Sequence, residues 1–224
     1  MKLWNKYLYR SHISEKKFRE ILRLLCEDLD ATRIASFTKV QRKTINRILT
    51  KIRLRIFDLC QSEEKLSGEI EVDESYFGAR RVRGKRGRGA RGKIPVIGLL
   101  KRKGKVFTQI IPNCERKQLL PVIKGQVLKN STVYTDGWSS YDSLVLNGYK
   151  HHRIYHSENE FARGKNHVNG IESFWSYTKR RLAKFNGVKK ESFVLHLKES
   201  EYRWNHKTQN LYQILMKNFR ENPL

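Results

Sequence analysis

The chain of 224 residues contains 47 Lys and Arg against 22 Asp and Glu, which gives a formal net charge of +25 at pH 7. Such a charge attracts polyanions, so nucleic acid is the partner that the composition predicts. A disordered basic tail is excluded, because 38% of the residues are hydrophobic and 11% are aromatic, more than disordered chains contain.

The three cysteines, Cys26, Cys60 and Cys114, are odd in number and far apart. They match neither a disulfide framework nor the paired spacing of zinc ligands, so we expect a reducing cytoplasm and no zinc. The longest apolar run, residues 94–100, is much too short to cross a bilayer. The sequence therefore predicts no membrane partner.

The first 62 residues are predicted to form a small all-α domain. Ser14 is placed to cap a first helix, and apolar residues follow it at helical spacing: Phe18, Ile21, Leu22, Leu25 and Leu29. A shorter helix is expected over residues 30–36. The pattern Thr38-Lys39-Val40-Gln41 matches a capping box and predicts the start of a third helix.

The third helix carries polar and basic residues opposite its apolar stripe. Their types suit contacts with phosphates and base edges, and the candidates for DNA binding are Gln41, Arg42, Lys43, Asn46 and Arg47. A short helix, a tight turn and a basic helix resemble a helix-turn-helix, whose second helix lies in the major groove. A helical bundle with a solvated basic face explains the same pattern, so both interpretations stay open.

A polar stretch over residues 61–68 separates this domain from a second one, which is expected to span residues 66–224. A basic insertion over residues 80–93 lies within the second domain and contains no acid. It is either a solubilising loop or, as we favour, a clamp on a nucleic-acid backbone. Its cations are Arg80, Arg81, Arg83, Lys85, Arg86, Arg88, Arg91 and Lys93.

The second domain begins with a strand in which apolar and polar residues alternate. Ile70 and Val72 are expected on the buried face, so Asp73 points away from it. Two neighbouring acids are rivals to Asp73 for a functional role. Glu71 shares its face but lies further from the strand end, whereas Glu74 is expected to point the other way.

Four further β-prone runs follow, the first two as a hairpin: residues 94–100, 105–111, 131–135 and 153–155. A helix is expected over residues 115–129. The third run ends at Asp136, where functional side chains are commonly exposed, although a turn residue explains this aspartate too. Three strands, a helix, two strands and a helix indicate a ribonuclease-H-like α/β fold, a mixed sheet flanked by helices.

The helix after these strands carries a third acid. Ile171, Phe174 and Trp175 belong to its apolar stripe, while Glu172 and Lys179 are seven residues apart and share one flank. That separation is too long for a usual ion pair on one helix. A metal-binding carboxylate beside a lysine that holds DNA explains the spacing better. The remaining residues 191–218 are expected to be helical core.

Three segments together are typical of one family: residues 71–78 (EVDESYFG), 134–141 (YTDGWSSY) and 167–175 (HVNGIESFW). In this order they resemble the catalytic blocks of DDE transposases from bacterial insertion sequences, in the subgroup related to the eukaryotic Merlin elements. The resemblance covers about residues 66 to 210. Many relatives carry a cysteine-rich zinc ribbon, which this sequence lacks.

The resemblance implies a metal-binding triad of Asp73, Asp136 and Glu172, with His167 and Asn169 as accessory residues. Two Mg²⁺ or Mn²⁺ ions would then serve DNA cleavage and strand transfer. The implied partners are double-stranded DNA, as element ends and target, and further copies of the chain in a homodimer or larger assembly. Such a protein would be cytoplasmic and associated with the nucleoid.

Two other functions remain open at this point. A non-catalytic DNA-binding regulator would use the N-terminal helices and the basic insertion without cutting DNA. A ribonuclease-H-type nuclease or resolvase would share the acids and the metal ions but lack the strand-transfer step.

Overall fold

The computed structural model describes residues 5–78, 92–136, 144–154, 168–185 and 187–224. The chain forms two compact units, one of Met1–Gln61 with His206–Leu224 and the other of Ser62–Asn205. In the described part of the chain, no helix has the length and apolar character needed to cross a membrane.

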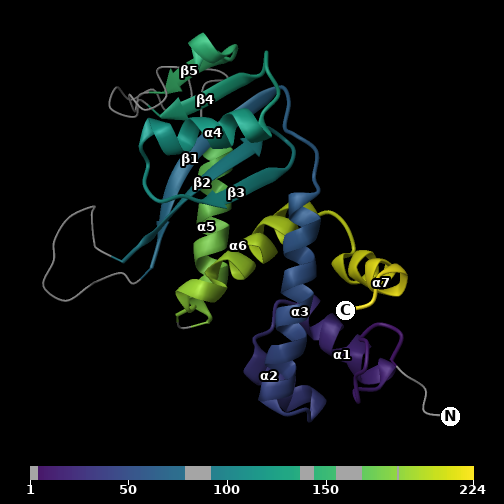
Figure 1. Ribbon diagram of the computed structural model, residues 1–224. Helices are drawn as coiled ribbons and strands as arrows, with labels where there is room; N and C mark the ends of the chain where they lie inside the picture. The colour runs from purple at the N-terminus through teal and green to yellow at the C-terminus, as the bar shows by residue number, and fades with distance from the viewer. Residues whose placement is uncertain (1–4, 79–91, 137–143, 155–167, 186) are drawn as a thin grey trace, which may run out of the picture. The chain divides into compact units, whose positions relative to one another are not determined.

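The first unit is built from helices α1 (Glu15–Cys26), α2 (Ala31–Thr38), α3 (Arg42–Gln61) and α7 (Leu211–Glu221) (Figure 1). Ser14 caps α1 as predicted, because its side chain accepts the backbone N–H of Lys17 at 3.2 Å. Four residues of the predicted stripe, Phe18, Ile21, Leu22 and Leu25, are buried in α1, whereas Leu29 lies beyond the end of α1 and is half-buried. The Phe18 ring lies 6.0 Å from the ring of Phe219 in α7.

The turn between α2 and α3 differs from the prediction. Thr38 does not cap α3 but is the last residue of α2, where its hydroxyl donates to the Ile34 carbonyl at 2.7 Å. Lys39 follows with a φ of 55°, the left-handed conformation that glycine often supplies at a helix end. The predicted capping box was therefore wrong, and α3 begins at Arg42, three residues later than a cap at Thr38 implies.

The C-terminal segment also corrects the prediction. The continuous helix expected over residues 191–218 is broken into α6 (Lys190–Asn205) and α7. The second domain is predicted to extend to residue 224, but His206–Leu224 packs with the N-terminal helices. Among the contacts that hold it there, the Tyr9 backbone donates to the Leu224 carbonyl at 2.9 Å, and Arg55 donates to the Asn218 side chain at 3.0 Å.

The described strands of the second unit form one sheet with the order β3-β2-β1-β4-β5. They are β1 (Glu69–Phe77), β2 (Ile94–Lys101), β3 (Val106–Ile110), β4 (Thr132–Asp136) and β5 (Lys150–Ile154). Strand β1 is antiparallel to β2 and parallel to β4, and β4 is parallel to β5. This is the ribonuclease-H-like topology, so the predicted fold class and hairpin are confirmed, while β5 starts earlier than expected.

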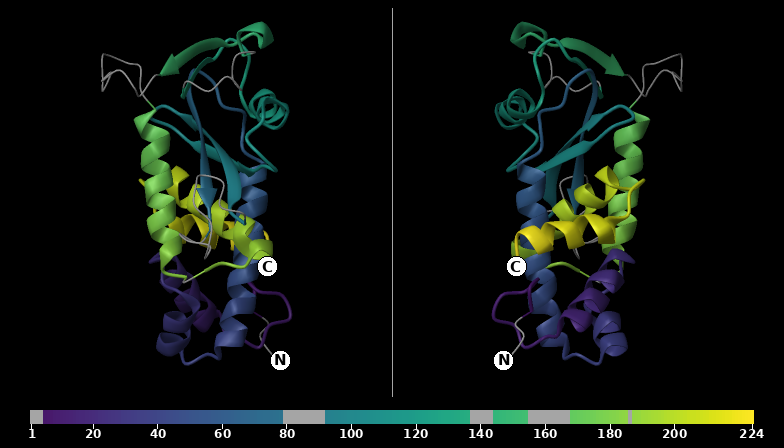
Figure 2. Two further views of the ribbon diagram at one scale, coloured as in Figure 1. Left: turned by 90° about the vertical axis from the view of Figure 1, so that its left-hand side faces the viewer. Right: turned by 90° about the vertical axis from the view of Figure 1, so that its right-hand side faces the viewer.

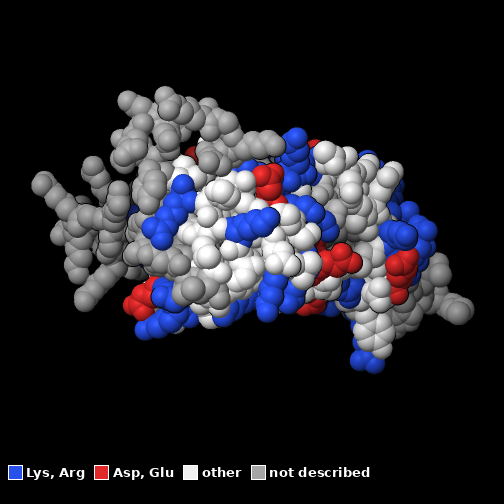
Figure 3. Space-filling model, turned by 90° about the horizontal axis from the view of Figure 1, so that it is seen from above, with Lys and Arg blue, Asp and Glu red and all other residues white. Residues whose placement is uncertain are grey.

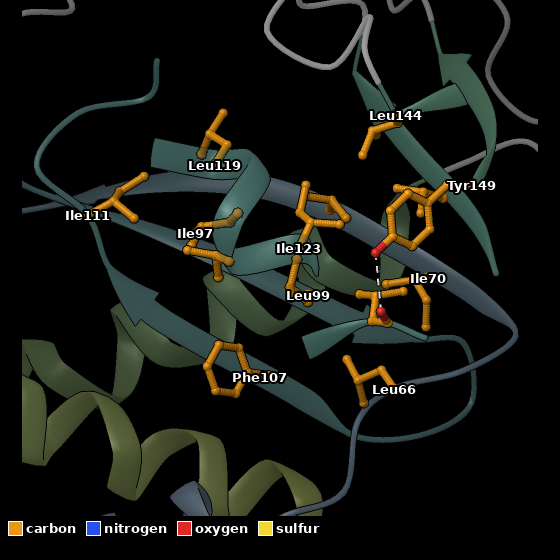
Figure 4. Packing of buried hydrophobic residues seen from close by; sticks show 14 of the residues in the cluster. Leu66, Ile70, Ile97, Leu99, Phe107, Ile111, Leu119, Ile123, Leu144 and Tyr149 are labelled. Carbon is orange, nitrogen blue, oxygen red and sulfur yellow. Dashed lines mark hydrogen bonds between the residues drawn. The ribbon is translucent and has the colours of Figure 1, made fainter. Parts of the chain in front are cut away.

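Helices cover both faces of the sheet (Figures 1 and 2). Helix α4 (Arg116–Gln126) lies on one face, where Leu119 and Ile123 pack against residues of β1 and β2 such as Ile70 and Leu99 (Figure 4). Helices α5 (Asn169–Ala183) and α6 lie on the other. Residues of β1 alternate between the two faces, so Glu71 and Asp73 face α5.

Side chains of α6 complete the hydrogen bonds of the outer strand β3. The Asn205 amide accepts the Val106 N–H at 2.8 Å and donates to the Val106 carbonyl at 2.9 Å. Glu201 accepts both the backbone N–H and the hydroxyl of Thr108. Lys198 pairs with Glu201 at 2.9 Å, and both side chains are buried.

Candidate active site

Asp73 lies on β1 opposite Gly98 of β2, and a helix residue holds it in place. The indole N–H of Trp175, on α5, donates to Asp73 Oδ2 at 3.0 Å. The helical spacing predicts Trp175 in the apolar stripe of α5, and Trp175 is buried there. Its contact with Asp73 was missed, because nothing in the local pattern links residues 102 positions apart.

Gly98 makes this contact possible. A Cβ atom at this position would lie 2.5 Å from Trp175 Cζ2 and 2.8 Å from Ile171 Cδ1, closer than real Cβ contacts allow. The glycine therefore lets α5 approach the sheet closely at the level of Asp73. A glycine inside an apolar, β-prone run is the signal that could have indicated such an approach.

The register of the parallel strands β1 and β4 places Asp136 beside Asp73. Glu71 of β1 is paired with Tyr134 of β4, and two residues further along both strands come Asp73 and Asp136. Paired residues of neighbouring strands share a face, so Asp136 also belongs to the α5 side. Glu172 is exposed in the first turn of α5.

The charges of the other two acids act on Asp73. Burial raises the pKa of Asp73 to about 6, and the negative charges of Asp136 and Glu172 push this pKa in the same direction. Hydrogen bonds with the Glu74 backbone and with Trp175 act against the rise. An acid from β1, one from β4 and one from α5 therefore share one electrostatic environment.

The acids approach each other but do not form a closed cluster. Within the described ranges, no group of three His, Cys, Asp or Glu side chains is arranged tightly enough to hold a metal ion by itself. Residues 137–143, directly after Asp136, lie outside those ranges. Carboxylate oxygens are nevertheless the donors that Mg²⁺ and Mn²⁺ prefer.

Among the accessory candidates, Lys179 is exposed on α5, with its ammonium 5.8 Å from the centre of the Phe77 ring at the end of β1. Asn169 is the exposed first residue of α5, and His167 lies outside the described residues. Of the two rivals to Asp73, Glu74 belongs to the residues of β1 that face α4. Glu71 is fully buried on the α5 side.

The candidate DNA-binding residues of α3 lie together at its start. All are exposed: Gln41, Arg42, Lys43, Asn46 and Arg47. Most of the basic insertion lies outside the described residues, from Arg80 to Arg91, and Lys93 is half-buried just before β2. On the face drawn in Figure 3, Lys and Arg side chains are spread widely over the described residues, with few acids between them.

The strand order defines a class, the ribonuclease-H-like proteins, and Asp73 in the middle of β1, Asp136 at the end of β4 and Glu172 on α5 are the candidate acids of its site. The family model of the ISXO2-like transposase domain matches residues 65–205. This match covers more than half of the chain and nearly the whole second unit. The chain therefore belongs to the ISXO2-like transposase family.

Two relatives agree with this assignment. An uncharacterized transposase-like protein of Haemophilus influenzae is 48% identical over 103 residues, which cover 46% of this chain and 83% of the relative. An uncharacterized protein in the transposable element ISH50 of Halobacterium salinarum is 30% identical over 181 residues, 73% of this chain and 60% of the relative.

Solved structures also show similarity at low identity. A chain of the Mos1 strand transfer complex is 12% identical and aligns over 90% of this chain and 77% of its own length, with a TM-score of 0.31. A chain of a simian T-cell lymphotropic virus intasome is 9% identical over 64% of this chain and 50% of that one, with a TM-score of 0.41. At these scores the fold assignment rests on the strand order.

Proposed function

We propose that this protein is a DNA transposase that cuts the ends of its element and joins them to target DNA, with Asp73, Asp136 and Glu172 as the metal-binding catalytic acids. The observation that supports this most directly is the raised pKa of Asp73, to which burial and the charges of Asp136 and Glu172 contribute. Perturbed acids on converging elements are typical of catalytic sites.

The donor set fits divalent cations. Three nearby carboxylates repel one another, and bound cations relieve this repulsion. When bound, two Mg²⁺ or Mn²⁺ ions supply the charge that activates water or a 3′-hydroxyl and stabilises the attacked phosphate. Trp175 fixes one oxygen of Asp73, while the exposed Lys179 supplies a positive charge for a DNA phosphate.

DNA recognition is assigned to the exposed residues of α3 and to the basic insertion. With α2 and the turn at Lys39, α3 would act as the second helix of a helix-turn-helix. The partners are then element ends and target DNA, held by a homodimer or larger assembly in the cytoplasm, at the nucleoid. A relation to the Merlin elements and the lack of zinc remain predictions.

The central test is a cleavage and strand-transfer assay on DNA carrying the element's own ends, with Mg²⁺ or Mn²⁺. Glu172→Gln is compared with Glu191→Gln, because both glutamates are exposed in the first turn of a helix. Only Glu172 is coupled to Asp73. We expect wild type and Glu191→Gln to form joined products and Glu172→Gln to form none, with DNA binding kept.

Other outcomes identify the alternatives. Binding without cutting in either metal contradicts the enzyme and favours a DNA-binding regulator. Cutting without joining favours a nuclease or resolvase. Equal activity of Glu172→Gln and Glu191→Gln removes Glu172 from the site.

A second assay tests the recognition helix by measuring affinity for element ends against unrelated DNA. In one variant, alanine replaces Gln41, Arg42, Asn46 and Arg47, which removes two positive charges. The control Lys16→Ala/Arg19→Ala also removes two positive charges, but from α1. We expect only the α3 variant to lose the preference for element ends, since base contacts each contribute about 1–3 kcal/mol. An unchanged preference would remove α3 from end recognition.

A further inference from the structure

Glu71, the acid two positions before Asp73, uses both of its carboxylate oxygens inside the protein. Its side chain is 1% exposed. Oε2 accepts the backbone N–H of Ile171 at 2.9 Å, and Oε1 accepts the Nε–H of Arg102 at 3.1 Å. Glu71 therefore shares the face of Asp73, as the sequence predicted, but its oxygens are already occupied by other partners.

The contact with Ile171 fixes the beginning of α5. The first N–H groups of a helix have no partner within the helix, and a carboxylate there is favoured by the helix dipole. The residue before α5, Val168, provides no side-chain cap. Glu71 supplies this acceptor from β1, at a sequence distance of 100 residues, and the next residue of the helix is Glu172.

Gly170 permits this close approach. A Cβ atom at Gly170 would lie 2.8 Å from Glu71 Oε2 and 3.0 Å from Leu100 Cδ2. Any larger residue would push the first turn of α5 away from β1 or displace the carboxylate. The close contact with Glu71 thus explains why a glycine occupies this position of the segment HVNGIESFW, and the sequence alone did not reveal this contact.

Arg102 extends the same network to β4. Its guanidinium lies 3.8 Å from the centre of the Tyr134 ring, and the Tyr134 hydroxyl donates to Glu69 at 2.8 Å. Tyr134 precedes Asp136 by two residues on β4. The contacts of Glu71 and Arg102 therefore join the three elements that carry Asp73, Asp136 and Glu172.

We propose that Glu71 is a positioning residue: with Arg102 it sets the placement of α5 against β1 and β4, and thereby the distances among the three catalytic acids. This inference rests on the proposed function. In this proposal Glu71 contacts neither metal nor DNA, whereas Asp73 binds the metal ions. Partners that orient metal ligands in this way commonly change metal affinity about 10-fold to 100-fold when removed.

Two double variants separate positioning from folding, because each removes both members of the Glu71–Arg102 pair and leaves no unpaired charge in the interior. Arg102 also pairs with Glu69 at 3.5 Å, but Glu69 is exposed. Glu71→Gln/Arg102→Gln keeps a side-chain oxygen that can accept the Ile171 N–H. Glu71→Met/Arg102→Met has similar length but no acceptor. The measurements are urea unfolding, affinity for element-end DNA, and the Mg²⁺ and Mn²⁺ concentrations that give half-maximal cleavage.

We expect both double variants to fold and to bind DNA as the wild type does. The Met variant should need a Mg²⁺ concentration about 10-fold higher or more for half-maximal cleavage. The increase in the Mn²⁺ concentration should be smaller, because Mg²⁺ requires a more nearly ideal coordination geometry. The Gln variant should stay within about threefold of wild type, since its acceptor is retained. A merely structural role predicts instead that activity follows the folded fraction, with unchanged metal requirement.

Gly170→Ala gives a test in which Glu71 and Arg102 both remain. Its result decides between the two roles if the Met variant does not fold. We expect it to raise the Mg²⁺ requirement in the folded protein. An unchanged Mg²⁺ requirement in the folded Met variant overturns the positioning role. If the Met variant does not fold, an unchanged Mg²⁺ requirement in Gly170→Ala overturns it. If the wild type itself does not cut DNA in Mg²⁺ or Mn²⁺, the proposed function fails first, so the two failures are distinguishable.

Discussion

The two faces of the sheet are buried by different means. On the α4 face the contacts are largely apolar, with Ile70, Leu99 and Leu119 in one cluster. On the α5 face, Glu71 and Asp73 lie among aromatic and aliphatic residues, and each has partners from a distant part of the chain. The α4 face stabilises the fold, whereas on the α5 face the burial of acidic groups carries an energetic cost, which the proposed catalytic role of Asp73 explains.

The largest effect that separates the faces is expected from Asp73→Asn. If Asp73 binds metal as proposed, its loss removes several kcal/mol of transition-state stabilisation, so cleavage should fall by at least about 10³-fold. The same variant should be more stable than wild type at pH 8, by on the order of 1–3 kcal/mol, because it no longer buries a charge. Cleavage rates and urea unfolding without metal ions measure the two effects.

The pH dependence of that stability gain checks its cause. The folded-state pKa of Asp73 is about 6, above the ordinary 3.8. Its protonated form therefore stabilises the fold below 3.8, and this contribution is lost as the pH rises through about 6. The advantage of Asp73→Asn should shrink as the pH falls from 8 to 4. Asp58→Asn, at an exposed acid of α3, should show no such trend, and equal trends would contradict the assignment.

The opposite result is expected on the α4 face from Leu119→Ala. Leu119 is fully buried, and removing its side chain leaves a cavity that should cost about 3 kcal/mol of unfolding free energy. Cleavage per folded molecule should be unchanged, measured at a temperature where the variant is folded. A specific loss of catalysis would show that the α4 face contributes to the site after all.

Two glycines provide a matched comparison of the faces. Gly98→Ala places a methyl group against Trp175, so overpacking should cost about 1–3 kcal/mol and also raise the Mg²⁺ requirement for cleavage. At Gly125 of α4, an added Cβ atom would meet no neighbouring atom within 4 Å, and Gly125→Ala should stabilise the helix by up to about 1 kcal/mol. Thermal unfolding and metal titration of both variants distinguish these outcomes.

The smallest effect is expected from Trp175→Phe. An aromatic ring remains to pack against Phe77 and Phe174, but the N–H donor to Asp73 is lost. Unfolding free energy should change by about 1 kcal/mol, while the Mg²⁺ requirement rises by about 10-fold. A metal titration that superimposes on that of the wild type would show that Asp73 needs no support from this indole.

Much of the fold follows from local patterns. The alternation around Ile70 and Val72, the hairpin and the helix that bears Glu172 were all predicted correctly, because periodicity reports which residues are buried. Local patterns failed where a distant segment decides the outcome. The buried side of α7 packs with the N-terminal helices, and its sequence indicates only that it needs a partner.

The site shows the same division. The positions of Asp136 at the end of a strand and of Glu172 on a helix were predicted from the sequence, whereas Asp73 was expected near a strand end and lies in the middle of β1, which continues to Phe77. Asp73 was expected simply to point away from the core, yet α5 covers this face too. The roles of Gly98, Gly170 and Trp175 arise from contacts between elements. No single segment encodes such contacts, so periodicity cannot reveal them.

The attachment of α6 to β3 has a consequence for how copies of the protein can meet. An outer strand usually presents a row of open backbone groups to which another chain can add. Here Asn205 and Glu201 occupy such groups at Val106 and Thr108. The sheet cannot be extended by strand addition at these residues, so the proposed assembly on DNA would have to form through other surfaces.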